Sequence, residues 1–487
     1  MRERAAAGSA LAATLALFSL PIANPDVFWH LSAGRWMAAH LAVPRADWLS
    51  HTMAGAPWVD FEWLTQVLWY GVLEACGMRG LWGLKVLVLC ACAAVLWRIL
   101  GLYACRPAAR GLGVLAWALG CRGFNDLRPE GFSVLFFLGL WAWLDARRLK
   151  GDPPVTRRET AVLCAVFAAW ANLHAGFVCG LALLGAFAAA EAARARSAAP
   201  MARALLYAAA TLVNPYGPKV YTVVWQHRET LAALQGAIAE WGAPTVLDRY
   251  SWPFWGTLAA AWAAVLVRHL RSRDAPWEHL SALALFSVLG SRHARMAIFL
   301  MSVAVPATAA ALGSFRLTDA RPRLRRLILG CAAAALAAAF LDAAASGAFQ
   351  ARALAAPPAE GPVRFLQAEG KVFKGRRIYN TWHWGGYLGW RLGPELKVFY
   401  DGRYIFHPLL LEKQRTRDAS EFGAFLARHG VEAAVVERRP IYAYFYPESE
   451  WALVYSDDRG LVLVRRKAFP PEWVAEFNRW PSMGEPR

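Results

Sequence analysis

The chain has 487 residues, of which 57% are hydrophobic and only 18% are charged. Soluble domains carry about a quarter charged residues, so the composition argues against an ordinary cytosolic enzyme and excludes a disordered chain. The net charge of +18 does not predict a nucleic-acid partner, because excess Lys and Arg in a membrane protein gather in cytoplasmic loops. The 24 Trp are typical of membrane interfaces and sugar-binding surfaces. We interpret the 8 Cys as small buried hydrophobic residues.

Uncharged apolar runs recur along the first two thirds of the chain, and each predicts a membrane-crossing helix. The runs cover 5–22, 86–97, 111–121, 131–144, 160–190, 204–218, 250–267, 280–291, 296–315 and 327–341. The run 160–190 is long enough for two helices and is interrupted by Asn172-Leu173-His174, so about eleven spans result. The run 111–121 is the weakest. A helix-like stretch at 62–77 is expected to stay outside the membrane or in its interface.

Clusters of basic residues between the runs set the predicted orientation, because such loops face the cytoplasm. The clusters lie at 2–4, 98–110, 147–158, 194–203, 268–273 and 316–326. We expect a multi-pass protein of the inner (cytoplasmic) membrane with its N-terminus in the cytoplasm. The first run is predicted to be an uncleaved anchor, although its basic start MRER also fits a cleaved signal peptide.

The chain changes character near residue 345. We predict a transmembrane module at 1–345, with a long first outer loop at about 24–79, and a soluble domain at 346–487. The segments KGRRIYNT, LKVFYDGR, VEAAVVERR, WALVYSDD and GLVLVRR predict short strands, and ASEFGAFLARHG predicts a helix between them. Strands alternating with helices indicate a small α/β domain, which the orientation assigns to the extracytoplasmic side.

Polar residues near the predicted outer surface form the candidate site, because ionisable groups at membrane depth are costly and tend to be functional. They are Asp26, Asp60, Glu62, Arg128, Glu130, Asn172, His174, Asn214, Tyr216, Glu240, Arg292, His293 and Arg295. His30 lies on the same helical face as Asp26. This set fits a reaction on a sugar phosphate, since Arg binds phosphate and a carboxylate can accept a proton from a hydroxyl.

Structural interpretations of these residues remain open. Asp26 can cap the helix that follows it, and His30 can be a packed interfacial histidine. The sequence Asn214-Pro215-Tyr216-Gly217 is first of all a helix stop and turn. Other side chains can simply reach lipid headgroups or satisfy a tight interhelical turn: Arg292, Arg295, Asn172 and His174.

The stretch NPDVFWHLSAGRWMAAHLAVPRADWLSHTMAGAPWVDFEWLTQVL resembles the first outer loop of GT-C-fold glycosyltransferases. It is most similar to a bacterial membrane-protein group with a D-x-W-W-H-L-x-x-G-like opening. RPEGFSVL, WANLHAGFVCG, LVNPYG, AEWGAP and SRHARMAIF resemble later elements of that group. YNTWHWGGYLGWRLGPELKVFYDGR resembles its W-G-G-Y-L and D-G-R signatures, so the likeness covers most of the chain.

The resemblance implies a GT-C-like integral-membrane glycosyltransferase that moves a sugar from a polyprenyl-phosphate donor to a lipid, glycan or protein acceptor. Asp26 matches the catalytic base. The residues expected to neutralise the donor phosphate are Arg128, Arg292, His293 and Arg295. Those expected to orient the sugar or the acceptor are His30, Asp60, Glu62, Asn172, His174, Asn214, Tyr216 and Glu240. The soluble domain is expected to shape the acceptor entrance through Trp382, Trp384, Tyr387 and Asp401, although Asp401 can equally form a turn.

The sequence departs from its relatives in the first loop. Val27 and Phe28 follow Asp26 where a second acid is common, and Asp60 and Glu62 stand where many relatives have a basic residue. These carboxylates leave a divalent cation open, but we predict no metal ligand because three well-placed ones are not evident. The alternative function is a non-catalytic transporter or a scaffold in envelope polysaccharide assembly. A transporter is disfavoured because the polar groups lie near one surface and no repeat is evident.

Overall fold

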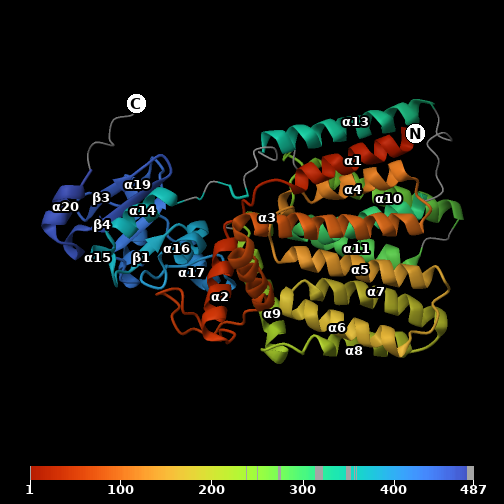
Figure 1. Cartoon of the computed structure of the whole chain (residues 1–487), viewed down its shortest axis with the longest axis horizontal. Helices are drawn as coiled ribbons and strands as arrows, with labels where there is room; N and C mark the ends of the chain where they lie inside the picture. The colour runs from red at the N-terminus through yellow and green to blue at the C-terminus, as the bar shows by residue number, and fades with distance from the viewer. Residues whose placement is uncertain are drawn as a thin grey trace. The chain divides into compact units, whose positions relative to one another are not determined.

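The computed structural model describes residues 2–236, 238–248, 251–272, 276–312, 322–346, 353–355, 357 and 359–479. Its internal contacts divide the chain into two compact units (Figure 1). The helical unit comprises Met1–Ala23, Val72–Val224 and Ile238–Ala355. The mixed unit comprises Asn24–Gly71, Trp225–Ala237 and Ala356–Arg487, so most of the predicted first outer loop groups with the C-terminal residues.

Each apolar run of the sequence overlaps a helix in the described part of the chain, although the runs 5–22 and 204–218 extend past the ends of theirs. These helices are α1 (Arg2–Phe18), α3 (Trp63–Leu102), α4 (Pro107–Gly120), α5 (Glu130–Arg148), α6 (Arg157–Leu173), α7 (Phe177–Ala195), α8 (Ala199–Ala210), α10 (Trp252–Ser272), α11 (Trp277–Arg292), α12 (Ala297–Leu312) and α13 (Pro322–Ala345). The predicted division of 160–190 is confirmed, because α6 ends at Leu173 and α7 begins at Phe177. Three basic-cluster residues lie outside the described residues: Arg273, Arg316 and Arg321.

Three helical stretches of the described chain are long and apolar enough to cross a membrane, namely Trp63–Leu102, Phe177–Ala195 and Ala294–Leu312. The count of about eleven spans therefore stays a prediction. The helix α3 is interrupted at Gly77, whose φ of 62° and ψ of −166° are not helical. A positive φ costs glycine little, so Gly77 can separate the predicted stretch 62–77 from the apolar run at 86–97.

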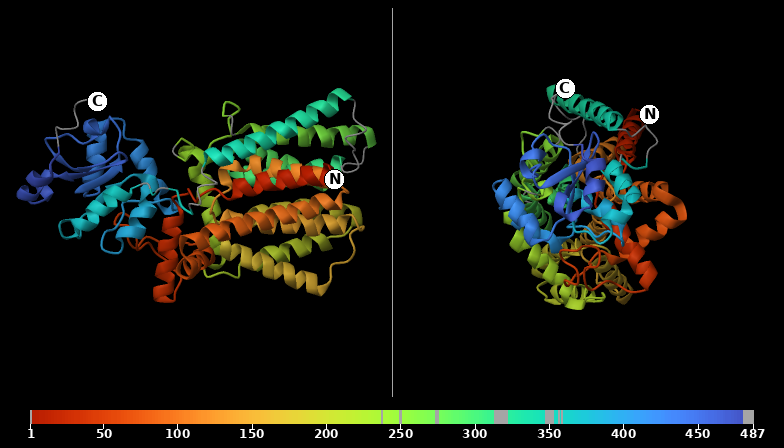
Figure 2. Two further views of the ribbon diagram at one scale, coloured as in Figure 1. Left: turned by 45° about the horizontal axis from the view of Figure 1, so that its top comes forward. Right: turned by 90° about the vertical axis from the view of Figure 1, so that its left-hand side faces the viewer.

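The helices of the helical unit pack along one another. In this bundle α1 lies against α4 and α13, α12 lies against α10 and α11, and α5 lies against α7 (Figure 2). Short 3₁₀ turns lie between them: η1 (Arg122–Phe124), η2 (Gly217–Lys219), η3 (Ala239–Trp241) and η5 (Ala294–Met296). The helix α9 (Val220–Leu234) is divided between the two units after Val224.

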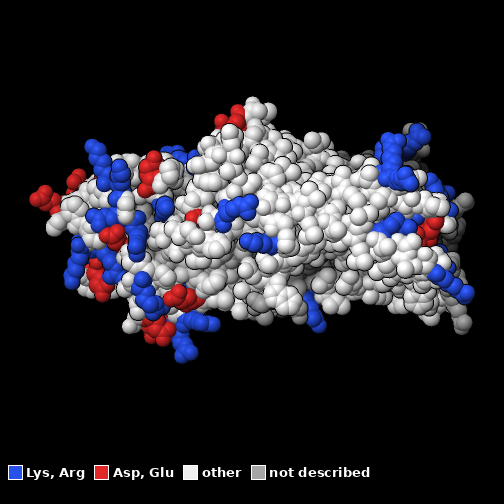
Figure 3. All heavy atoms as spheres, turned by 90° about the horizontal axis from the view of Figure 1, so that it is seen from below, with Lys and Arg blue, Asp and Glu red and all other residues white. Residues whose placement is uncertain are grey.

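Basic residues gather at one end of the helical unit. Arg106 Nη1 lies 2.7 Å from Glu3 Oε1, and Arg194 Nη1 lies 3.1 Å from Glu278 Oε1. Figure 3 shows Lys and Arg clustered at the right-hand end of this unit, beside a surface with few charges. A surface that faces lipid has to exclude charges in this way, because a charged side chain in the bilayer is costly.

The mixed unit contains a four-stranded sheet of order β1-β2-β4-β3. The strands are β1 (Ile378–Asn380), β2 (Ala433–Glu437), β3 (Trp451–Ser456) and β4 (Gly460–Arg465). β1 and β2 are parallel and pair Tyr379 with Ala434, whereas β4 is antiparallel to both β2 and β3. Four of the five predicted strands are confirmed. The prediction of a strand in LKVFYDGR is wrong, because that segment forms only an isolated bridge between Val398 and Ser50.

Helices of the mixed unit surround this sheet and the first loop. They are α2 (Val27–His40), α14 (Glu360–Ala368), α15 (Gly370–Phe373), α16 (Gly385–Leu392), α17 (His407–Gln414), α18 (Ala419–Arg428), α19 (Tyr442–Phe445) and α20 (Pro471–Phe477), with the short turns η7 (Trp382–Trp384), η8 (Tyr404–Phe406) and η9 (Arg466–Ala468). The predicted helix α18 is confirmed, and Asp418 caps it by accepting a 2.9 Å hydrogen bond from Glu421 N. α16 packs against α2 (Figure 1), which brings a C-terminal motif to the first loop.

Candidate functional site

Asp26 is the residue that precedes α2 in the mixed unit. Its side chain makes no capping hydrogen bond to that helix, so the capping interpretation is wrong. The backbone around it is held by the buried Asn24, whose Oδ1 accepts a 3.2 Å hydrogen bond from Asp26 N. The Asp26 carboxylate is half-buried and does not cap the helix that follows it.

Glycines of the C-terminal motifs lie directly against the Asp26 turn. A Cβ atom at Gly402 would lie 2.3 Å from Asp26 Oδ1 and 3.2 Å from Trp29 Nε1. A Cβ atom at Gly386 would lie 3.1 Å from Trp29 N. Only glycine fits these approaches without movement, so the W-G-G-Y-L and D-G-R motifs pack against the segment that holds Asp26.

Trp29 contributes a hydrogen-bond donor beside Asp26. The side chain is buried, and its ring centroid lies 3.6 Å from that of His30. Its Nε1 is buried and has no hydrogen-bond partner among the described residues. Because the indole N–H and the Asp26 carboxylate approach the same point at Gly402, a donor and an acceptor lie together. Trp29 was not among the predicted site residues, although the NPDVFWH motif contains it.

The structure brings three further predicted residues together in the first loop. His30 is 2% exposed, and its Nδ1 lies 3.9 Å from Glu62 Oε2. Asp60 is 1% exposed, and its Oδ1 accepts a 2.7 Å hydrogen bond from Gln66 Nε2 and a 3.4 Å hydrogen bond from Glu62 N. Burial raises the pKa of Asp60 to about 7, because the charged carboxylate loses its hydration.

Asp401 lies in a buried ion-pair network instead of at an entrance. Arg403 Nε donates to both oxygens of Asp401 at 2.9 and 3.0 Å, and Arg403 Nη2 lies 2.8 Å from Asp47 Oδ1. The Arg403 guanidinium also packs over the Trp58 ring, 4.7 Å from its centroid. Arg403 N donates to Asp401 Oδ1 at 3.0 Å, so the turn interpretation of Asp401 is the one that the structure supports. Burial raises the pKa of Asp401, and the Arg403 charge opposes that rise.

The aromatic residues of the WHWGGY motif are mostly core residues. Trp384 and Tyr387 are both buried, and the Tyr387 hydroxyl donates to Glu360 Oε2. Tyr387 also meets Phe28 of α2 edge-to-face, with 4.7 Å between ring centroids. Trp382 alone among the three is partly exposed, and it packs edge-to-face on Tyr400. Of the three, only Trp382 therefore keeps side-chain surface open to solvent.

In the helical unit, two of the predicted phosphate-binding arginines are paired with carboxylates. Arg128 Nη1 lies 2.8 Å from Glu240 Oε2 and 3.9 Å from Glu130 Oε2. Arg295 Nη1 lies 3.2 Å from Glu240 Oε1, and Arg295 Nε forms a second ion pair with Glu130 Oε1. These four residues form a network whose formal charges cancel. The pairing of Glu130 and Glu240 with the arginines was not predicted, because the partners come from separate segments.

Arg292 and His293 occupy different environments. Arg292 is exposed and forms no ion pair with any residue that the structure describes. His293 Nδ1 lies 2.9 Å from the Trp241 carbonyl oxygen and so donates a hydrogen bond to it. His293 therefore holds η3 in place, while Arg292 is the predicted cation whose charge is not neutralised by a described carboxylate.

The remaining predicted residues of the helical unit hold its turns together. Asn172 Nδ2 donates to Val213 O at 2.8 Å, which joins the end of α6 to the end of α8. His174 Nδ1 accepts a 3.0 Å hydrogen bond from Gly176 N and lies 2.8 Å from Ser133 Oγ. Asn214 Oδ1 accepts a 2.8 Å hydrogen bond from the backbone N of the buried Tyr216, as a turn-forming Asn does.

The predicted single pocket draws on both units. Asp26, His30, Asp60 and Glu62 belong to the mixed unit, whereas Arg128 and Arg292 belong to the helical unit. Their assembly into one pocket therefore stays a prediction. No three His, Cys, Asp or Glu side chains of the described chain form a group that could hold a metal ion.

Comparison with known proteins relates the chain to solved structures only, since no protein-family model and no curated protein matches it. It is similar to the Archaeoglobus fulgidus oligosaccharyltransferase AglB in complex with an inhibitory peptide and a dolichol-phosphate, with a TM-score of 0.57, 12% identity, and coverage of 88% of this chain and 69% of that chain. A structure of the same oligosaccharyltransferase with Zn and sulfate has a TM-score of 0.53 and 13% identity, over 95% of this chain and 74% of that chain.

A third similar structure is ArnT from Cupriavidus metallidurans bound to undecaprenyl phosphate. It has a TM-score of 0.51 and 15% identity, and the match covers 93% of this chain and 96% of that chain. At such identities the likeness concerns the fold. The chain therefore has the GT-C fold of these structures, a helical region followed by a C-terminal domain that contains a sheet, as the sequence predicted.

Proposed function

We propose that this chain is an integral-membrane glycosyltransferase that moves a sugar from a polyprenyl-phosphate donor to an acceptor hydroxyl or similar group. The observation that carries the proposal is the packing of Gly386 and Gly402 around Asp26 and Trp29. Two C-terminal motifs and the first-loop motif, far apart in the sequence, thereby position one carboxylate. The GT-C fold adds support, since the similar structures of AglB and ArnT contain dolichol-phosphate and undecaprenyl phosphate.

In the proposed reaction Asp26 accepts the proton of the acceptor hydroxyl. The hydroxyl oxygen then forms a bond to the anomeric carbon of the sugar, and the bond from that carbon to the phosphate oxygen breaks. The polyprenyl phosphate leaves with the electron pair, and the exposed Arg292, which has no ion-pair partner among the described residues, is the cation assigned to stabilise its charge. Trp29 lies with Asp26 against Gly402, and this packing fixes the wall of the site beside the carboxylate.

The location and membrane topology are part of the same proposal. About eleven spans would cross the inner membrane, with the basic ends in the cytoplasm and the mixed unit on the extracytoplasmic side. The quoted first-loop and C-terminal motifs support membership of the bacterial group with the D-x-W-W-H-L-x-x-G-like opening. The described residues contain no group of three His, Cys, Asp or Glu side chains that could hold a metal ion. Use of a divalent cation stays an open prediction.

The test uses the full chain in lipid nanodiscs. Transfer is followed from a panel of undecaprenyl-phosphate sugars, and undecaprenyl phosphate binding is measured by native mass spectrometry. Asp26→Asn is nearly isosteric, so it should abolish transfer while binding of undecaprenyl phosphate and thermal stability persist. Asp458→Asn makes the same chemical change at an exposed position of the mixed unit and should leave transfer intact.

Two results would decide against the proposal. Full transfer by Asp26→Asn would remove Asp26 as the base. Absence of both transfer and undecaprenyl phosphate binding in the unaltered chain would favour the non-catalytic scaffold.

A further inference from the structure

We propose that the mixed unit has a separate binding site for an anionic sugar, in a cavity of about 380 Å³ lined by α14, α15, α16 and the segment after α16. The inference rests on the proposed function, and it assigns acidic saccharides as the ligand class of this second site. Its residues lie outside the Asp26 cluster, and none of them was singled out in the sequence. A cavity of this size falls in the usual range for small-molecule sites, about 300–1,000 Å³.

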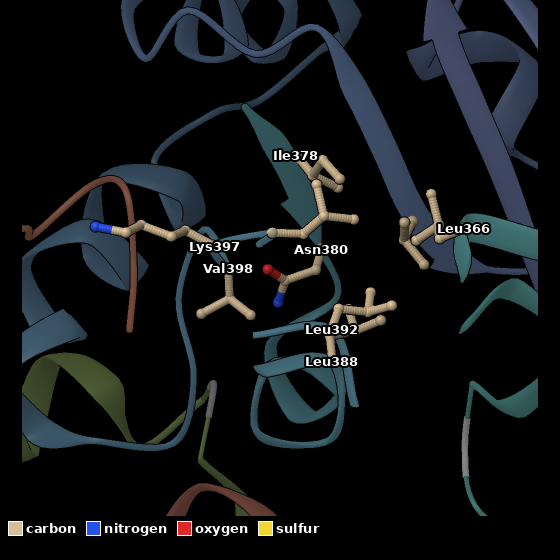
Figure 4. Close-up of a pocket in the computed structure, with 9 residues that line it drawn as sticks. Leu366, Ile378, Asn380, Leu388, Leu392, Lys397 and Val398 are labelled. Atoms are coloured by element: carbon tan, nitrogen blue, oxygen red, sulfur yellow. The ribbon is translucent and has the colours of Figure 1, made fainter. Parts of the chain in front are cut away.

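The buried floor of this cavity is apolar. It consists of Leu366, Leu392 and Leu396, which are at most 8% exposed. Behind the leucines lies a second cavity of about 10 Å³ (Figure 4), enough for a single water molecule. Asn380 lines that small cavity, and its Oδ1 accepts a 2.8 Å hydrogen bond from Phe399 N. The floor is therefore supported from behind by a hydrogen-bonded strand end.

The rim of the larger cavity is basic. Lys371 and Lys374 are both exposed, and neither forms an ion pair with a described residue. Arg391 also lines the cavity, but its Nη1 lies 2.7 Å from Glu360 Oε2, so that charge is already neutralised. Two ammonium groups are left to attract an anion, whereas Lys397 of the small cavity points its ammonium group away from it (Figure 4).

The rest of the rim suits hydroxyl groups. Gln367 Nε2 donates to Arg391 O at 3.3 Å, which leaves its amide oxygen as an acceptor, and Glu395 presents an exposed carboxylate. A sugar ring has an apolar C–H face for the leucine floor and hydroxyls for Gln367 and Glu395. An acid group on that sugar would meet the two lysines.

Other anionic ligands fit less well. Three leucines cannot cover a polyprenyl tail, which needs a far longer apolar surface. A peptide with a run of acidic residues would be repelled by Glu395, since like charges at close range oppose each other. One acid group on an otherwise uncharged sugar needs no long apolar surface, and the two lysines outnumber the single Glu395 carboxylate.

The experiment measures sugar binding to the full chain in nanodiscs of uncharged lipid, by saturation-transfer NMR. Glucuronic acid and glucose 6-phosphate should bind at least about fivefold more tightly than glucose, and added salt should weaken that preference. The double change Lys371→Ala/Lys374→Ala should remove the preference. The control Arg417→Ala/Lys467→Ala removes the same charge at exposed positions away from the cavity and should retain it.

Each outcome has one meaning. Equal binding of glucose and the two acids, or an unchanged preference in the lysine variant, overturns the inference. Lysine-dependent binding to phosphatidylglycerol vesicles without binding of the acidic sugars overturns it in favour of a lipid surface. Undecaprenyl phosphate binding is measured on the same samples. Absence of that binding would contradict the proposed function, and it is distinguishable from a failure of the sugar-binding inference.

Discussion

Gly402 lies so close to Asp26 that a Cβ atom at position 402 would be 2.3 Å from the Asp26 carboxylate. The approach joins the D-G-R motif of the C-terminal region to the first loop within the mixed unit. Only glycine leaves room for the Asp26 carboxylate at this position, and that carboxylate is the one that we assign as the base.

Gly402→Ala should reduce sugar transfer by about a hundredfold, because the added methyl group displaces Asp26 and a shift near 1 Å is enough for such a loss. The measurement is transfer rate at saturating donor, together with the thermal unfolding temperature. Gly423→Ala in α18 is the matched control, since nothing lies within 4 Å of its Cβ position. Normal transfer by Gly402→Ala would show that the position of Asp26 is unimportant.

Arg403→Gln should lower the free energy of unfolding by about 3 kcal/mol or more, because it leaves the buried carboxylates of Asp401 and Asp47 without their cation. Denaturant unfolding followed by tryptophan fluorescence would report the loss. Arg417→Gln removes an exposed arginine and should change stability by less than about 0.5 kcal/mol. Equal effects of the two changes on the free energy of unfolding would mean that the buried network does not stabilise the fold.

Asp60 should make stability depend on pH. Burial raises its pKa from 3.8 to about 7 in the folded chain, so between these values the folded state holds a proton that the unfolded state has lost. Stability is then fullest below pH 4 and falls as pH rises toward 7, by up to about 1.4 kcal/mol for each pH unit.

Asp60→Asn should remove this contribution and raise stability at pH 8, because the amide oxygen can still accept from Gln66. Unfolding of both proteins is compared from pH 4 to 8. A difference between them that stays constant across this range would show that Asp60 does not titrate there.

Arg292→Gln should weaken undecaprenyl phosphate binding without loss of stability, because Arg292 is exposed and unpaired among the described residues. Arg295→Gln should instead destabilise the chain, since it breaks the ion pairs with Glu130 and Glu240. Binding by native mass spectrometry and thermal unfolding separate the two roles. Unaltered affinity in Arg292→Gln would discard its part in donor binding.

Local patterns were sufficient to predict the long apolar helices of the helical unit and most of the strands. The uncharged runs overlap α1, α3–α8 and α10–α13, and Asn172-Leu173-His174 marks the end of α6. The alternation and length of apolar residues report on local burial, which the sequence carries directly. The same reasoning failed for LKVFYDGR, whose apolar residues pack as a loop, because a strand also needs a partner edge that no local pattern supplies.

The sequence by itself determined an apolar helical region, a C-terminal α/β region and Asp26 as the candidate base. Only the tertiary structure decided that Arg128 and Arg295 are matched by Glu240 and Glu130, that Asp401 is a buried partner of Arg403, and that Gly402 adjoins Asp26. The physical reason is the distance along the chain between the residues that interact. Secondary structure follows from neighbours along the chain, whereas charge pairing and close backbone approach depend on segments that folding alone brings together.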